Sequence, residues 1–158
     1  MGTQPQFVIA VRHGEYSSYD GKSQPLTSDG IEKITELAQK IFSITQDKTV
    51  AIFSSPLDRA VRSATIISEA INVKIEIEKS LSGDKVSDGK KSAGIIIEKL
   101  KAQERNADVI ITIGHLGAPS GVIGGFSCKF LNQEISGFTI NKGFAIILDL
   151  ATGSYKMF

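Results

Sequence analysis

The chain has 158 residues, of which 41% are hydrophobic and 22% are charged, as is typical of one globular domain, which we expect to span residues 1–158. The formal net charge of +1 excludes a global field that would attract nucleic acid or an anionic membrane, so any anion binding must be local. A single cysteine excludes an intrachain disulfide, and without a signal-like segment or a long apolar run the expected location is cytoplasmic.

The first predicted element is a strand over residues 7–11, a short apolar run rich in β-branched residues, as is typical of a strand buried on both faces. It leads directly into Arg12-His13-Gly14. After a polar loop, either Thr27 or Ser28 can cap a helix. The apolar positions with helical spacing in this helix, which should pack on the strand, are Ile31, Ile34, Leu37, Ala38, Ile41 and Phe42.

A second buried strand is predicted over residues 50–53, followed by the turn Ser54-Ser55-Pro56 and a helix with one apolar side. That side is expected to hold Ala60, Ala64, Ile67 and Ala70. Residues 73–77 are predicted to form a third strand. Because charged and apolar residues alternate in it, an exposed position at the edge of the sheet is favoured.

Residues 80–91 are polar and contain glycine, so we expect a loop there. The next helix is predicted over residues 92–104. Its buried side is expected to hold Ile96, Ile97 and Leu100.

A buried strand is predicted over residues 109–113, and it leads into Gly114-His115. The stretch over residues 116–126 is rich in glycine. Because glycine weakens helices, this composition favours only a short helix near Ser120.

Two more strands, over residues 144–150 and 155–158, are predicted to close the chain. The alternation of strands and helices predicts an α/β fold, a three-layer sandwich with a mostly parallel central sheet flanked by helices. In such folds the binding crevice lies outside the carboxyl ends of the strands. Candidate functional residues are therefore those that directly follow the strands.

The chain contains two histidines, His13 and His115. Each follows the end of a predicted strand and is separated from it by one residue. Both side chains should therefore reach the same crevice. Arg12 precedes His13, and Arg59 lies about one turn into the helix after the second strand, so it can point there too. Two arginines and two histidines at strand ends would form a compact set of donors for a dianionic phosphate.

Three separated motifs carry a resemblance to a known family. They are residues 11–15 (Val-Arg-His-Gly-Glu), residues 54–60 (Ser-Ser-Pro-Leu-Asp-Arg-Ala) and Gly114-His115. In this order and at these strand ends, they resemble the motifs of the histidine phosphatase superfamily, whose fold is phosphoglycerate mutase-like. Pro25-Leu26-Thr27 with Gly30 is a supporting match to the start of the family's first helix.

The resemblance implies a phosphatase with a histidine nucleophile and a phosphohistidine enzyme intermediate. Neutral His13 would attack phosphorus in line, while Arg12, Gly14, Arg59 and His115 hold the phosphate. A rigid ring of such donors supplies most of what phosphoryl transfer requires. The resemblance therefore implies no metal ion and no other cofactor.

The sequence departs from the family pattern at two phosphate-pocket motifs. Ser63-Ala64 stands where the family often has Thr-Ala, a change expected to affect packing more than phosphate binding. The run Leu116-Gly117-Ala118-Pro119 lacks a polar residue that many members place beside the pocket, so we expect one auxiliary phosphate contact to be missing.

A third departure concerns the proton donor. Larger members of the family carry a glutamate in a long insertion after the third strand, where it protonates the leaving oxygen. The equivalent loop here is short and offers Asp84 and Asp88, although aspartates next to glycine are also typical turn formers. Asp84 is the candidate general acid.

The short chain without a lid resembles most the compact phosphohistidine phosphatases of the SixA type, which implies a phosphorylated protein as the partner. The alternative is a phosphomonoesterase of a small metabolite such as a sugar or nucleotide phosphate, with specificity groups in the loops over residues 17–24 and 80–91. A third possibility, from a different class, is a non-catalytic phosphate-binding relative.

Three further residues have side chains that could contribute to a site. Glu15 can either orient the pocket or face water. Arg62 matches no motif and is expected on a solvated helix face. Cys128 lies near no motif, and we expect it to be a small residue of the core.

Overall fold

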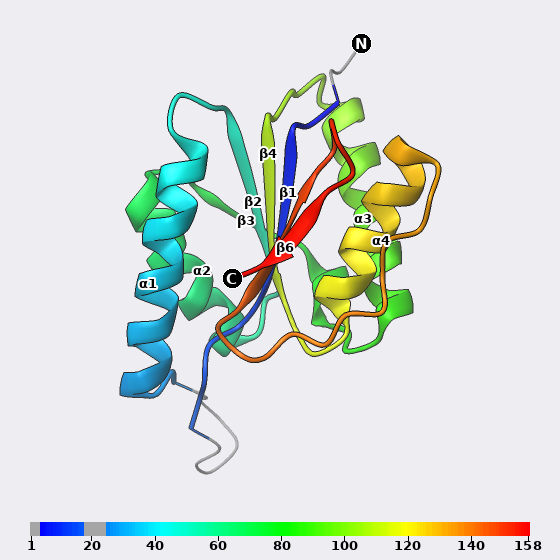
Figure 1. Ribbon diagram of the computed structural model, residues 1–158. Coiled ribbons are helices and arrows are strands. Elements are labelled where there is room, and N and C mark those ends of the chain that lie inside the picture. The colour runs from blue at the N-terminus through cyan, green and yellow to red at the C-terminus, as the bar shows by residue number, and fades with distance from the viewer. Residues whose placement is uncertain (1–3, 18–24) are drawn as a thin grey trace.

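The computed structural model describes residues 4–17 and 25–158, which form one six-stranded sheet with helices on both faces (Figure 1). The strands lie in the order β3-β2-β4-β1-β5-β6. Neighbouring strands among the first four are parallel, whereas β5 is antiparallel to both of its neighbours, β1 and β6. The predicted α/β sandwich with a mostly parallel sheet is confirmed. Along the chain the strands are β1 (Phe7–Arg12), β2 (Val50–Ser54), β3 (Ile75–Ile77), β4 (Val109–Gly114), β5 (Ala145–Asp149) and β6 (Tyr155–Met157).

Two helices cover each face of the sheet. Figure 1 shows α1 and α2 on one side and α3 and α4 on the other. Successive residues of a strand point to opposite faces, so in β1 Ile9 and Val11 pack toward α1 and α2, whereas Val8 and Ala10 pack toward α3 and α4. Burial of each valine or isoleucine side chain contributes about 1.5–3 kcal/mol. The helices are α1 (Ser28–Thr45), α2 (Asp58–Ile71), α3 (Val86–Ala102) and α4 (Ala118–Leu131).

The first two helices begin as expected but bury fewer residues than expected. The N-cap of α1 is Thr27, whose Oγ1 accepts a hydrogen bond from the Gly30 amide at 3.0 Å. Ile31 and Phe42 are 47% and 46% exposed, because both lie at one edge of the apolar stripe of α1. Ala70 of α2 is exposed as well, so its predicted burial is wrong.

The loop expected over residues 80–91 is largely helical. A 3₁₀ turn, η1 (Lys79–Ser82), precedes α3, which begins at Val86. Asp88 stabilises this start, because its Oδ2 accepts a hydrogen bond from the Lys85 amide at 3.0 Å. The aspartate that sequence analysis placed in a loop is thus part of a helix cap.

The glycine-rich stretch after His115 forms a full helix, so the prediction of only a short helix near Ser120 is wrong. Its glycines allow α3 and α4 to approach closely. A Cβ atom on Gly89 of α3 would collide with the Ala118 carbonyl, and one on Gly121 of α4 would collide with the Val86 carbonyl. These glycines serve packing between helices, which their number alone did not indicate.

Of the other predictions from the sequence, some are confirmed and one is wrong. β3 lies at the edge of the sheet, as expected. Cys128 is exposed on α4, so its predicted place in the core is wrong. Arg62 is exposed on α2, as expected. Among residues 4–17 and 25–158, no helix is long and apolar enough to cross a membrane.

Candidate active site

The ends of three neighbouring strands are hydrogen-bonded together and bring the candidate residues to one place. Arg12, the last residue of β1, lies opposite Gly114 of β4 in the parallel register. The His13 amide donates to the Gly114 carbonyl at 3.1 Å, and the Ser55 amide donates to the Ile113 carbonyl at 3.0 Å. The carboxyl ends of β1, β2 and β4 therefore present their following residues side by side.

His13 is held with one ring nitrogen available for attack. The side chain is 3% exposed, and its Nδ1 lies 2.9 Å from the Gly14 carbonyl oxygen. Because a carbonyl only accepts hydrogen bonds, this contact assigns the proton to Nδ1 and leaves a lone pair on Nε2. In this tautomer Nε2 can act as a nucleophile.

The two candidate arginines are held by different contacts. Arg59, in the first turn of α2, donates from Nε to His13 Nε2 at 3.3 Å, and its guanidinium lies 4.8 Å from the Tyr16 ring. Arg12 donates from Nη1 to the Ile140 carbonyl at 2.9 Å. A phosphate that reaches His13 Nε2 must displace Arg59 Nε from it, and the displaced guanidinium can then bind the phosphate.

His115 lies beside His13, with 5.0 Å between the ring centroids. Its Nε2 is 2.7 Å from Ser55 Oγ, and the same hydroxyl accepts a hydrogen bond from the Leu57 amide. The Ser55 hydroxyl can donate its proton to His115 Nε2, and in that arrangement the imidazole proton lies on Nδ1. His115 Nδ1 and Arg12 Nε are buried and make no hydrogen bond within the described residues. Phosphate oxygens would satisfy two such donors.

Burial keeps both histidines neutral. It lowers the pKa of His13 from 6.5 to about 4; the hydrogen bond to Gly14 opposes this shift, whereas His115, Arg59 and Arg12 add to it. Burial also lowers the pKa of His115 to about 4, with Arg59 and Arg12 adding to the effect. At neutral pH the site thus combines two neutral imidazoles with the positive charge of two arginines.

Ser63 connects two parts of this site, which sequence analysis missed. Its Oγ accepts a hydrogen bond from the Gly14 amide at 2.9 Å and donates to the Arg59 carbonyl at 2.8 Å. The Gly14 amide, expected to contact phosphate, is thus used by Ser63. The available signal was that Ser63 retains the hydroxyl group of the family's threonine.

Tyr16 and Lys142 form a rim beside His13, and neither was predicted. The Tyr16 ring packs edge-on against the His13 ring at 5.3 Å. Lys142 Nζ lies 4.8 Å from the Tyr16 ring centroid and 3.3 Å from Glu15 Oε1. Glu15 is exposed and makes its ion pair there, so it lies at the rim. Lys142 is 127 residues from Glu15 in sequence, and no local pattern indicated the contact.

The candidate general acid lies next to the loop that carries His115. The Asp84 carbonyl accepts a hydrogen bond from the Gly117 amide at 2.8 Å, whereas the Asp84 side chain is exposed and makes no hydrogen bond or ion pair within residues 4–17 and 25–158. Leu116, beside His115, is 54% exposed. Most of the loop expected to contribute specificity, residues 18–24, lies outside the described residues.

The family comparison agrees with this site. Residues 8–83, which include the first two motifs, match the model of the histidine phosphatase superfamily (branch 1). This match, over just under half of the chain, supports the histidine phosphatase superfamily. Within the described part of the chain, no group of three or more His, Cys, Asp or Glu side chains is placed to hold a metal ion.

Solved structures of phosphatases share the fold of this chain at low sequence identity. One is the protein histidine phosphatase SixA complexed with tungstate, with 16% identity, a TM-score of 0.67 and coverage of 96% of this chain and 93% of that chain. A mycobacterial glucosyl-3-phosphoglycerate phosphatase complexed with VO3 has 14% identity, a TM-score of 0.66 and coverage of 96% and 97%. A putative α-ribazole-5′-P phosphatase from Escherichia coli has 14% identity, a TM-score of 0.64 and coverage of 97% and 94%. No curated protein sequence matches the chain.

Proposed function

We propose that this phosphatase acts on protein phosphohistidine and that His13 is its nucleophile. The observation that carries the proposal is the neutral His13, whose Nε2 lone pair lies among Arg12, Arg59 and His115. The partner in this proposal is a phosphorylated protein, and the location is cytoplasmic.

The reaction would proceed in two displacements. His13 Nε2 attacks phosphorus, and the bond from phosphorus to the leaving group breaks, with its electron pair going to the leaving group. Water then attacks the phosphorus of phosphorylated His13, which releases inorganic phosphate and restores the neutral imidazole. Arg12, Arg59 and the Nδ1–H of His115 would stabilise the charge on the equatorial oxygens in both steps.

The choice of phosphohistidine rests on the leaving group. The side chain of Asp84, the only acid proposed, is exposed and held by no hydrogen bond within the described chain, so it is poorly fixed for proton donation. An alkyl ester must release a basic alkoxide, for which a positioned acid contributes about 10²–10⁴-fold. A phosphohistidine ring that is protonated on its other nitrogen leaves as a neutral imidazole, whose conjugate acid has a pKa near 6.5, so it needs no such help. The related structures include phosphatases named for a protein histidine and for small metabolites, so they support either class.

Substrate competition tests the proposal. The wild type should have a higher kcat/KM for a phosphohistidine peptide than for a sugar phosphate. Asp84→Asn should leave phosphohistidine hydrolysis within about twofold of the wild type while slowing alkyl phosphate hydrolysis by about tenfold or more. Asp47→Asn, an exposed change at the end of α1, is the matched control.

Three outcomes would contradict the proposal. A wild type that prefers the sugar phosphate would assign a small-molecule phosphomonoesterase. An equal loss on both substrates in Asp84→Asn would mean that Asp84 contributes to binding or folding instead of proton transfer. A protein that binds phosphate but hydrolyses neither substrate would be a non-catalytic relative.

A further inference from the structure

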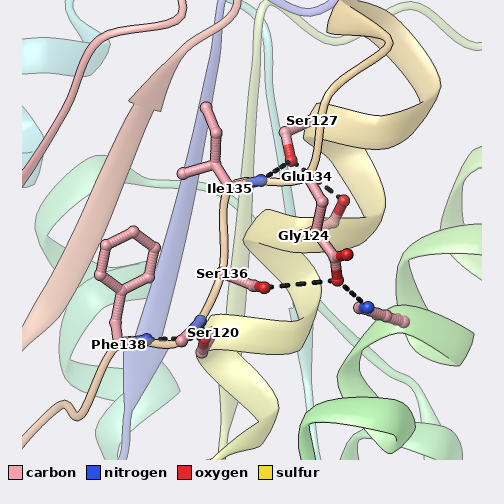
Figure 2. Close-up of polar contacts among 9 residues, drawn as sticks. Ser120, Gly124, Ser127, Glu134, Ile135, Ser136 and Phe138 are labelled. Carbon is pink, nitrogen blue, oxygen red and sulfur yellow. Dashed lines mark hydrogen bonds and ion pairs between the residues drawn. The ribbon is translucent and has the colours of Figure 1, made fainter.

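A long segment without helix or strand, residues 132–144, connects α4 to β5 and runs beside α4 (Figures 1 and 2). Its apolar side chains pack on the core beneath α3 and α4: Ile140 is 2% exposed, and Ile135 and Phe138 are partly buried. An irregular segment packed in this way needs hydrogen-bond partners for its backbone amides. Two buried serines of α4 provide them.

Figure 2 shows these serines and the segment that they hold. Ser127 Oγ accepts a hydrogen bond from the Ile135 amide at 2.9 Å. Ser120 Oγ accepts two, from the Gly137 amide at 2.9 Å and from the Phe138 amide at 3.1 Å. Two successive amides can point to one hydroxyl because Gly137 has a φ of +86°, which other residues rarely adopt.

The far end of the same segment contacts the proposed active site. The Ile140 carbonyl accepts the hydrogen bond from Arg12 Nη1 at 2.9 Å. The Gly143 amide donates to the carbonyls of Arg12 and His13, at 3.2 and 3.0 Å. Ser120 thus holds the backbone up to Phe138, two residues before Ile140, whose carbonyl orients the Arg12 guanidinium.

The two serines differ in their distance from this contact along the chain. Ser120 holds positions 137 and 138, the latter two residues before Ile140, whereas Ser127 holds position 135, five residues before it. Both serines are buried, at 1% and 0% exposure, and the hydrogen bonds that their hydroxyls accept from the segment are partly buried. Loss of either should lower stability, but only Ser120 should control where the Ile140 carbonyl lies.

We infer that Ser120 is a positioning residue for Arg12: by fixing residues 137–140 it places the Ile140 carbonyl, which holds the Arg12 guanidinium ready for the phosphate. The inference rests on the proposed function only in taking phosphate as the bound group. Fixing one guanidinium nitrogen on the protein leaves the remaining donors in a defined orientation, so less side-chain freedom is lost on binding.

The test compares Ser120→Ala with Ser127→Ala. Both variants should unfold at lower denaturant concentration than the wild type. Ser120→Ala should bind orthovanadate about tenfold more weakly, a smaller loss than the 10²–10³ typical when a donor is removed outright, whereas Ser127→Ala should stay within about twofold of the wild type. Equal weakening in the two variants would overturn the inference, because it would show a general effect of destabilising α4.

A double-mutant cycle shows whether the effect passes through Arg12. In an Arg12→Ala background, Ser120→Ala should change orthovanadate affinity by less than about twofold, because the group that it positions is gone. A full additional loss would overturn the inference. A wild type that binds orthovanadate but hydrolyses no phosphohistidine would contradict the proposed function and leave this comparison intact.

A ligand-free measurement keeps the inference testable if orthovanadate does not bind at all. The ¹⁵Nε–¹H signal of Arg12, assigned by its loss in Arg12→Ala, should shift or exchange faster with water in Ser120→Ala and stay unchanged in Ser127→Ala. An unchanged Arg12 signal in Ser120→Ala would overturn the inference.

Discussion

The neutral state of both histidines predicts how the protein responds to acid. Their pKa values of about 4 lie below the 6.5 of an exposed histidine. Between these values the unfolded chain binds protons that the folded chain does not, so stability is complete above about pH 7 and falls as pH decreases through 6.5 toward 4. By pH 5 the loss amounts to as much as about 2 kcal/mol for each histidine.

Two measurements check this prediction. Because the chain contains two histidines, their ring signals can be followed by NMR and assigned with His13→Gln. Both signals should be nearly constant from pH 8 to 5.5. The free energy of unfolding in denaturant should be lower at pH 5 than at pH 7.5, and His13→Gln should remove about half of the part that the histidines contribute.

A midpoint near pH 6.5 for His13 would refute the reasoning, because it would show that the ring is protonated as readily as in water. An unfolding free energy that is the same at pH 7.5 and pH 5 would refute it as well. If His115 alone titrated with a midpoint near pH 6.5, burial would not be lowering its pKa, and the neutral ring with its proton on Nδ1 would be wrong for His115.

Two further predictions concern the serines that hold the site. Ser63→Ala should lower the free energy of unfolding by about 1–3 kcal/mol and reduce kcat/KM, because the buried Gly14 amide loses its acceptor. Ser63→Thr keeps the hydroxyl and should retain the wild-type values of both. Equal defects in the two variants would exclude the hydroxyl as the cause. Ser55→Ala should change the ¹⁵N shifts of the His115 ring but not those of His13, and reduce kcat/KM by about tenfold or more; unchanged His115 shifts would exclude the proposed role of Ser55 in setting its tautomer.

The sequence predicted the fold and the convergence of the candidate residues because both depend on local signals. Buried strands appear as continuous apolar runs, and the carboxyl ends of parallel strands meet at one edge of a sheet. His13 and His115 therefore come together without knowledge of any long-range contact. Arg59 follows because it lies in the first turn of the helix after such a strand.

The missed features depend on contacts between distant segments. The glycines of α4 indicated a broken helix, yet Gly121 is required because α3 lies against it, and no local signal distinguishes these two causes. Lys142 reaches Glu15 across 127 residues. Ser120 acts on Arg12 only through the return of residues 137–140. Asp88 was assigned to a loop because an aspartate before glycine is typical of turns as well as of helix starts.

If His13 carries the phosphoryl group during turnover, the phosphorylated residue can be trapped before water attacks it. Wild-type protein mixed with ³²P-labelled phosphohistidine peptide and quenched in alkali within milliseconds should retain label on His13. The bond should survive alkali and break in acid, as a phosphoramidate does, and His13→Ala should retain no label. Label on an acid-stable residue, or turnover by His13→Ala at the wild-type rate, would contradict the account.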